Sequence, residues 1–319
     1  MEIPFKGRPM HKFLSAACIA VLAAALSPAA LAQSTASFSA ELQAKYRVIP
    51  NVTYLTAENY QVKLDIYQSR DTSTPQPTLM FFHGGGWVQG TKESSILSLL
   101  PYLEMGWNVV NVEYRMAEVA LAPAAVEDCI CALRWVTQNA KQYNIDTARI
   151  VTSGASAGGH LALTTAMIPS SAGLDRRCPG GRAGNVYFGP EELKVAAVVN
   201  WYGVTDVGDL MEGPNRRIFA ATWLGGLENR KEIAARVSPL TYVRPGLPPV
   251  ISIQGDADGT VPYTHSVRLH AALEKAGVPN KLLTVPGGGH GNFKATEYPA
   301  LYDQIRDFLS KHGLMKRGS

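Results

Sequence analysis

Four cysteines in 319 residues are too few for a disulfide-rich scaffold, so the fold has to rest on a buried apolar core. The chain also lacks internal repeats, low-complexity segments and a Pro/Ser/Gly-rich linker between domains. Its composition, 46% hydrophobic and 18% charged, is typical of a globular protein. Together these features exclude fibrous, disordered and repeat proteins and favour one large domain.

Long apolar runs are equally scarce, and the most apolar one lies near the start of the chain. Residues 13–26 are apolar but span a bilayer poorly, and they follow the basic residues Lys6, Arg8 and Lys12. The small-x-small pattern Ala30-Leu31-Ala32 comes next. This arrangement predicts a secretory signal peptide over residues 1–32 and export to the periplasm or the medium. An uncleaved membrane anchor is the alternative reading.

A strong charge of either sign is missing as well. The formal net charge is +4, and removal of residues 1–32 with their net +2 leaves about +2. No block of Lys and Arg stands out, which argues against nucleic acid or an anionic membrane surface as a partner. No second apolar stretch approaches the length of a span, so we expect no stable membrane insertion after signal cleavage. The sequence leaves the oligomeric state open.

Three cysteines remain after the predicted cleavage. Cys129 and Cys131 lie two positions apart on a predicted helix and point to different faces, so they are poor partners for each other. We expect one of them to pair with Cys178 and the other to remain a buried thiol, and the sequence does not decide which. The spacing of Cys and His indicates no metal site.

Two alternating segments at 48–55 and 60–67 read as an antiparallel edge pair, and from residue 78 onward short apolar strands alternate with helical periods. This pattern predicts an α/β fold with a mostly parallel central sheet, helices on both faces and insertions over the active site. The insertions would be residues 170–193 and 206–248. The predicted organisation is a signal peptide (1–32), a leader and N-terminal edge (33–59), a catalytic domain (60–312) and a C-terminal tail (313–319). Predicted strands cover 78–82, 108–113, 149–153, 195–201, 250–254 and 281–285, and helices lie near 94–105, 123–143, 156–167, 263–276 and 296–312.

The segment 154–160 (GASAGGH) lies between a predicted strand and a predicted helix. Its Gly154-x-Ser156-x-Gly158 pattern is that of a nucleophile elbow, in which a sharp turn lifts the serine hydroxyl above the sheet edge. Ser156 is therefore the candidate nucleophile.

A serine nucleophile needs a base, and the base needs an orienting acid. Of seven histidines, His290 alone follows a strand within a glycine-rich loop (GGGHG), whereas the others fall in helices, in the signal peptide or at the start of another glycine run. Asp258, after the strand at 250–254, completes the chain order Ser, Asp, His. Asp206, at the end of the preceding strand, is a rival, and Asp256 reads as a turn-forming partner that hydrogen-bonds its own backbone.

A third glycine run, His83-Gly84-Gly85-Gly86, follows the strand at 78–82. Successive glycines leave backbone N–H groups unobstructed, so we expect Gly84 and Gly85, with the N–H of Ala157, to form an oxyanion hole.

These motifs, HGGGW, GASAGG, GDADGTVPY and GGGHG, resemble those of the α/β-hydrolase superfamily, and within it the hormone-sensitive-lipase-like esterases and the bacterial acetyl-xylan and feruloyl-esterase-like group. The resemblance covers about residues 60–312. It implies Ser156, Asp258 and His290 as the catalytic triad, and the oxyanion hole named above. It also implies that Trp87 forms part of the substrate pocket wall, with simple packing as the alternative. Gln254 replaces a histidine that is usual near the acid, and we expect it to support the loop.

The resemblance implies a serine esterase that needs no metal or organic cofactor and hydrolyses short-chain or aromatic carboxylic esters. Its substrate would be a small molecule or an ester on a polysaccharide, such as an acetyl or feruloyl group. The short leader favours an open cleft over a closed lipid pocket. Two alternatives are an arylformamidase-like amidase with the same triad and a catalytically inactive hydrolase fold used as a binding module.

Overall fold

The computed structural model describes residues 1, 28–179, 182–183, 186–187, 193–226 and 228–315. The chain forms two compact units, Met1–Glu41 and Leu42–Ser319. Most of the predicted signal peptide and the end of the predicted C-terminal tail lie outside the described residues. Helix α1 (Pro28–Lys45) runs through the predicted cleavage point and into the predicted leader, where we expected no helix.

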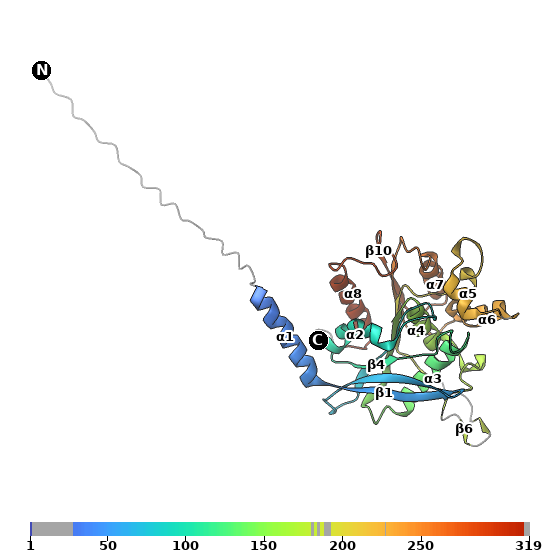
Figure 1. The fold of residues 1–319 in the computed structure, drawn as a ribbon. Coiled ribbons are helices and arrows are strands. Elements are labelled where there is room, and N and C mark those ends of the chain that lie inside the picture. Colours follow the sequence, from blue (N-terminus) through green and yellow to red (C-terminus); the bar gives the residue numbers. More distant parts are fainter. Residues whose placement is uncertain (2–27, 180–181, 184–185, 188–192, 227, 316–319) are drawn as a thin grey trace. The chain divides into compact units, whose positions relative to one another are not determined.

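The second unit is built on a central sheet, with β1 at one edge and β10 at the other (Figure 1). Its eight strands lie in the order β1-β2-β4-β3-β5-β8-β9-β10. Strands β1 and β2 form an antiparallel edge pair, β2 is antiparallel to β4, and the remaining neighbours are parallel. The mostly parallel sheet with an antiparallel edge is therefore confirmed. The bounds of the strands are β1 (Tyr46–Ala57), β2 (Tyr60–Ser69), β3 (Gln76–Phe82), β4 (Asn108–Val112), β5 (Ile145–Ala155), β8 (Ala197–Trp201), β9 (Val250–Gly255) and β10 (Asn280–Val285).

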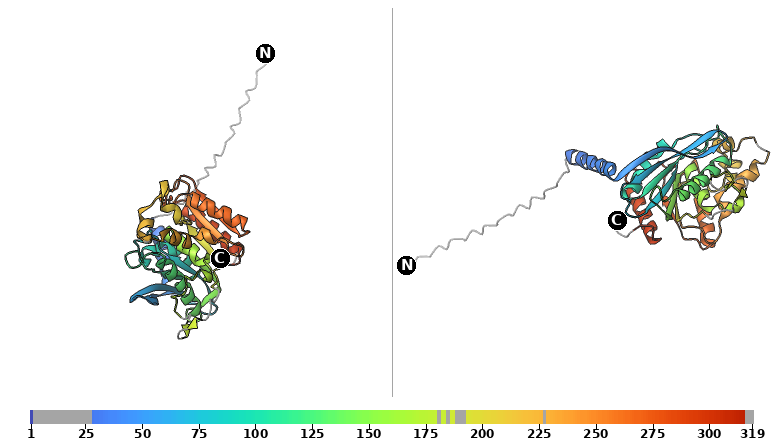
Figure 2. Two further views of the ribbon diagram at one scale, coloured as in Figure 1. Left: turned by 90° about the vertical axis from the view of Figure 1, so that its right-hand side faces the viewer. Right: turned by 90° about the horizontal axis from the view of Figure 1, so that it is seen from below.

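Helices cover both faces of this sheet, as the views from different sides show (Figure 2). Side chains alternate along each strand, so the neighbours Val198 and Val199 on β8 belong to two separate hydrophobic cores, one on each face of the sheet. Because both faces are buried, the inner strands are mostly apolar, as expected for a parallel sheet, and the polar residues among them, such as Asn111 and Asn200, are buried as well. The helices are α2 (Ile96–Glu104), α3 (Ala124–Gln138), α4 (Ala157–Met167), α5 (Ile218–Leu224), α6 (Arg230–Arg236), α7 (Thr264–Lys275) and α8 (Tyr298–Lys311).

The two predicted insertions differ in structure. The interval 206–248 folds into α5, α6 and three short 3-10 turns (Gly208–Leu210, Gly213–Asn215 and Pro239–Tyr242). The other interval begins with the 3-10 turn Ser170–Ala172, and its described part also contains the two-residue strands β6 (Arg182–Ala183) and β7 (Val186–Tyr187).

A disulfide joins Cys131 on α3 to Cys178, in the segment that follows α4, and Cys129 is a buried free thiol. The structure thus selects Cys131 from the two partners that the sequence allowed. A buried ion pair between Arg134 and Asp175, 2.7 Å apart, links the same two segments. Both links hold the chain beyond α4 against α3.

Candidate active site

Ser156 lies at the junction of β5 and α4, on a strained turn. Its φ of 57° is in the left-handed region, which residues other than glycine adopt only where the surrounding structure enforces it. The turn is so close to β3 that a Cβ at position 158 would lie 2.0 Å from the carbonyl oxygen of Phe82. Glycine is therefore required at position 158, and the serine is held at the carboxyl end of the parallel strands, as the elbow pattern predicts.

His290 lies between Ser156 and Asp258 and contacts both. The Ser156 hydroxyl donates to Nε2 of His290 over 2.8 Å, and Nδ1–H of His290 donates to Oδ2 of Asp258, also over 2.8 Å. The three residues come from the ends of β5, β10 and β9, which are brought together by the order of the sheet. The structure thus assembles the predicted nucleophile, base and acid into one continuous hydrogen-bonded relay.

The Asp258 carboxylate is buried but has several donors. Burial acts to raise its pKa, but the hydrogen bond and the charge of His290, with the N–H groups of Thr260 and Val261, outweigh this and lower the pKa. Gln254 donates to Oδ2 of Asp258 and to the carbonyl of Val261. It therefore supports the loop that carries Asp258 (the acid loop), as expected. Asp258 is therefore held ionised where the ring of His290 needs an acceptor.

The rival Asp206 and the neighbouring Asp256 have other partners. Asp206 forms an ion pair with Arg268 over 2.6 Å. Asp256 is exposed and accepts the N–H of Gly287. This hydrogen bond joins the acid loop to the loop that carries His290 (the base loop). It differs from the local hydrogen bond within a turn that we expected for Asp256. Neither contacts His290.

His160, four residues after the nucleophile, is fully buried. It accepts the indole N–H of Trp87 at Nδ1 and donates from Nε2 to the carbonyl of Val237. Burial lowers its pKa to about 4, so the ring is neutral at ordinary pH. His160 is a structural residue, in agreement with the elimination that selected His290 as the base.

The glycine loop after β3 lies directly against the nucleophile turn. A Cβ on Gly84 would come within 2.9 Å of the Ala155 carbonyl and 3.7 Å of the Ser156 Cβ. As the first residue of α4, Ala157 has an N–H with no partner within the helix. The predicted oxyanion donors are thus close to the serine hydroxyl.

An open cleft of about 440 Å³ surrounds these groups. The expectation that Trp87 forms part of its wall is not met, because Trp87 is fully buried and stacks on Trp223 beneath the surface. Phe219, near the start of α5, lines the cleft instead and packs on Trp87 from above. The complete lining is Gly84, Gly85, Gly86, Val88, Gln89, Ala155, Ser156, Tyr202, Phe219, Thr260 and His290.

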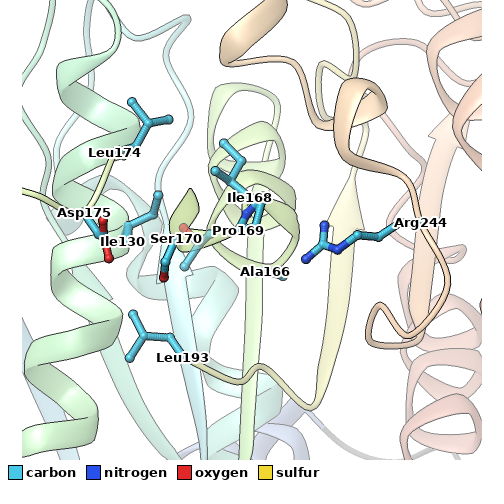
Figure 3. Close-up of a pocket in the computed structure, with 10 residues that line it drawn as sticks. Ile130, Ala166, Ile168, Pro169, Ser170, Leu174, Asp175, Leu193 and Arg244 are labelled. Atoms are coloured by element: carbon cyan, nitrogen blue, oxygen red, sulfur yellow. The ribbon is translucent and has the colours of Figure 1, made fainter. Parts of the chain in front are cut away.

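Only one of the two predicted insertions reaches the described cleft. Phe219 comes from 206–248, but none of the described residues of 170–193 lines it. Those residues border a separate, more enclosed cavity of about 140 Å³ beyond the far end of α4 (Figure 3), whose lining includes Ser170 and Asp175. There Arg244 donates to the carbonyl of Met167.

Sequence reasoning missed two residues that support the site. Tyr202 follows β8 with a φ of 40° and packs its ring edge against His290, with centroids 4.7 Å apart. Arg217 donates to the carbonyls of Gly259 and Thr260, and thereby ties the segment that carries Phe219 to the acid loop. The position of Tyr202 at a strand end was a usable signal, whereas no pattern marks Arg217.

Within the described ranges, no group of His, Cys, Asp and Glu side chains has the arrangement of a metal site. Over the same ranges, none of the helices combines the length and apolar character needed to cross a membrane.

The sequence matches the family BD-FAE over residues 64–273, which is well over half of the chain, and the family TAP-like protein over residues 228–319. It is 28% identical to the esterase LipC of Mycobacterium tuberculosis over 72% of this chain and 56% of that protein. It is 30% identical to an acetyl esterase of Salmonella paratyphi B over 50% of this chain and 43% of that protein. The chain thus spans about half the length of these relatives.

Two solved structures resemble most of the chain. A truncated carbohydrate esterase from gut microbiota is 27% identical, with a TM-score of 0.68, and the match covers 83% of this chain and 97% of that one. A thermophilic esterase from the Planctomycetes species Thermogutta terrifontis, solved with propionate bound, is also 27% identical, with a TM-score of 0.69 over 86% of this chain and 97% of that one.

Proposed function

This α/β-hydrolase belongs to the BD-FAE family, and on that premise we propose that it is a serine carboxylesterase acting on short-chain or aromatic carboxylic esters. The observation that carries the proposal is the relay of Ser156, His290 and Asp258, with two links of 2.8 Å. A fold used only for binding has no need of an ionised, buried acid that orients a histidine toward a strained serine. The intact relay therefore favours an enzyme over a binding module.

The proposed reaction is acyl transfer in two halves. His290 takes the proton of Ser156 as its oxygen attacks the ester carbonyl, and Asp258 holds the ring and stabilises the imidazolium that forms. Backbone N–H groups of Gly84, Gly85 and Ala157 stabilise the oxyanion. His290 then protonates the leaving alcohol. Water, activated by the same base, attacks the acyl-enzyme and releases the acid.

The cleft supports an ester with a short or aromatic acyl group, and its alcohol part can be large. Its lining is mostly backbone and glycine near Ser156, with Phe219 and Tyr202 as its aromatic walls and Gln89 and Thr260 as polar groups. Because the cleft is open, a polymer chain could extend beyond it while one ester enters. Acetyl or feruloyl groups on a polysaccharide are therefore our proposed natural substrates, in line with the carbohydrate esterase among the structural relatives.

Hydrolysis by purified residues 33–319 tests this function. The substrates are p-nitrophenyl esters from acetate to decanoate, acetylated xylan, methyl ferulate and N-formylkynurenine. We expect activity on acetate and on xylan or ferulate, with a fall toward decanoate. Turnover of N-formylkynurenine alone would favour an amidase, and a preference for decanoate would favour lipids.

Replacement of the nucleophile supplies the control. Ser156→Ala should lower kcat by about 10³- to 10⁶-fold while leaving the fold intact, because the oxyanion donors and the cleft remain. Circular dichroism and thermal melting check the fold. Activity within tenfold of the wild type in a folded variant would rule out Ser156 as the nucleophile.

We further propose that the chain is exported and cleaved after Ala32, and that it then acts in the periplasm or the medium without membrane or nucleic-acid partners. The basic start and the apolar run at 13–26 support this. Expression of the full chain followed by N-terminal sequencing tests it. A mature protein that begins at Gln33 is expected, and recovery of the intact chain in the membrane fraction would contradict it.

A further inference from the structure

His83 opens the glycine loop, yet its side chain does not reach the cleft. The ring is fully buried and stacks on Tyr114, with centroids 4.3 Å apart and planes 12° apart. The Tyr114 hydroxyl also donates to the His83 carbonyl over 2.8 Å. Tyr114 thus holds His83 twice, by stacking on its ring and by a hydrogen bond to its backbone.

Both ring nitrogens of His83 face oxygen acceptors. Nδ1 lies 2.8 Å from the carbonyl oxygen of Gly84, and Nε2 lies 3.2 Å from Oε1 of Glu113. A neutral imidazole has one N–H and can satisfy only one of these contacts as a donor. Because a carbonyl oxygen can only accept, the shorter contact identifies Nδ1 as the nitrogen that carries a proton for the Gly84 carbonyl.

Glu113 also holds the far end of the same loop. Its second oxygen, Oε2, accepts the backbone N–H of Lys92 over 2.9 Å. The Lys92 ammonium is not free to compete for Glu113, because it pairs with Asp65 over 3.0 Å and with Glu93. One carboxylate therefore fastens both residue 83 and residue 92, the two ends of the loop.

The bond from His83 fixes the direction of an N–H group in the loop. In a planar trans peptide, the C=O of one residue and the N–H of the next point in opposite directions. The Gly84 carbonyl points to the buried ring, so the N–H of Gly85 points the other way, toward the cleft that both glycines line. Within the described part of the chain, this N–H donates to no protein acceptor.

We propose that His83, through the hydrogen bond from its Nδ1–H to the Gly84 carbonyl, is a positioning residue that turns the Gly85 N–H into the oxyanion hole. The inference rests on the proposed esterase function, and it adds a buried hydrogen-bond donor behind the oxyanion hole that does not touch the substrate. A reversed 84–85 peptide would present a carbonyl oxygen to the developing oxyanion and repel it.

Two substitutions separate the two contacts of the ring. Asparagine places its amide nitrogen near the position of Nδ1, so His83→Asn keeps a donor for the Gly84 carbonyl. Glutamine reaches toward the position of Nε2, so His83→Gln keeps the contact to Glu113 and loses the donor to Gly84. If His83 only filled space, the two substitutions would have similar effects on activity.

Kinetics with p-nitrophenyl acetate and inhibition by an alkyl trifluoromethyl ketone, whose adduct with Ser156 carries an oxyanion, provide the test. We expect His83→Gln to lower kcat/KM and the affinity for the ketone by about 10²- to 10³-fold. KM should change little, and His83→Asn should remain within about tenfold of the wild type. Equal losses in both variants, or a loss confined to KM, would overturn the proposal.

A measurement on the unmutated protein covers the case in which His83→Gln does not fold. In ¹⁵N-histidine-labelled protein, the ring signals that disappear in His83→Asn identify His83. Nδ1 of His83 should carry a proton, and a bare Nδ1 would overturn the proposal. This readout needs no catalysis, so an absence of esterase activity would reject the proposed function without deciding the state of His83.

Discussion

The hydrogen bond from Ser156 to His290 joins residues 134 positions apart, and it forms because each lies at the carboxyl end of a strand in one parallel sheet. Strand ends of this kind are readable from sequence, which is why Ser156, Asp258 and His290 could be predicted. Trp87 could not be placed in this way. Its φ of 61° turns its backbone within the loop, and its side chain lies under Phe219, a contact 132 positions away that no local pattern encodes.

The first prediction at this scale concerns the acid. Asp258→Asn should lower kcat/KM by about 10³- to 10⁴-fold, because a neutral amide does not stabilise the imidazolium and can favour the wrong tautomer of His290. Steady-state kinetics on p-nitrophenyl acetate measures it. The matched control is Asp256→Asn, two positions earlier and exposed, which should leave kcat/KM within a fewfold. Equal effects of the two substitutions would contradict the assignment of the acid.

Among the elements, the inner strands and the long helices form close to where the sequence predicts them. The strands are buried on both faces and the helices on one, and each kind of burial leaves a hydrophobic pattern that can be read from the sequence. The predicted helix near 123–143 forms as α3 over Ala124–Gln138, and the predicted strand at 250–254 forms as β9. Helix α1 was missed because its sequence has no pronounced apolar stripe. The short helices of 206–248 were missed because they depend on tertiary contacts more than on periodicity.

A second prediction follows from the tether between α5 and the acid loop. Arg217→Ala removes the two hydrogen bonds to the carbonyls of Gly259 and Thr260. The acid loop and the cleft wall formed by Phe219 are then no longer held in fixed positions relative to each other. We expect kcat/KM to fall about tenfold or more, since small displacements of aligned groups are costly to catalysis.

The neighbouring arginine gives the matched control. Arg216 is exposed, and Arg216→Ala should leave kcat/KM unchanged. If the two variants lose activity equally, the effect comes from charge near the cleft and the tether is irrelevant.

A third prediction concerns the link between α3 and the segment after α4. Loss of the disulfide in Cys131→Ala/Cys178→Ala should lower the free energy of unfolding by about 4 kcal/mol, the value expected for a closed loop of this length. Urea denaturation measures the change. Kinetics should be little altered because neither cysteine lines the cleft.

Cys129→Ala, which keeps the disulfide, is the comparison for that variant. Purified residues 33–319 should also show one reactive thiol in denaturant, from Cys129. Three thiols, or equal stability of the double variant and Cys129→Ala, would contradict the pairing.

The molecule as a whole carries buried histidines that burial keeps neutral. The pKa of His160 falls from 6.5 to about 4 on folding, and burial also lowers the pKa values of His265 and His270. The unfolded chain binds protons at these groups below about pH 6.5, whereas the folded chain resists them. Stability should therefore be greatest above this pH and decline as the pH falls.

This fourth effect is measurable by urea unfolding between pH 7 and pH 4. His160 alone should reduce the free energy of unfolding by about 3 kcal/mol across that interval, and the other two rings add in the same direction. Circular dichroism at each pH follows the transition. A free energy of unfolding that is constant from pH 7 to pH 4.5 would show that these rings are not held neutral.

The bond between Cys131 and Cys178 has one more consequence, because the 47-residue interval that it closes contains the nucleophile. Ser156 thus lies within a loop of chain that the disulfide closes covalently, and β5 is the part of this loop that belongs to the sheet. A protease that cuts the surface turn at Ser170–Ala172 would open the chain without releasing a fragment. On a denaturing gel the cleaved molecule would migrate at full mass without reductant and as two pieces with it, because the disulfide is the covalent link between the piece that carries Ser156 and the piece that carries His290.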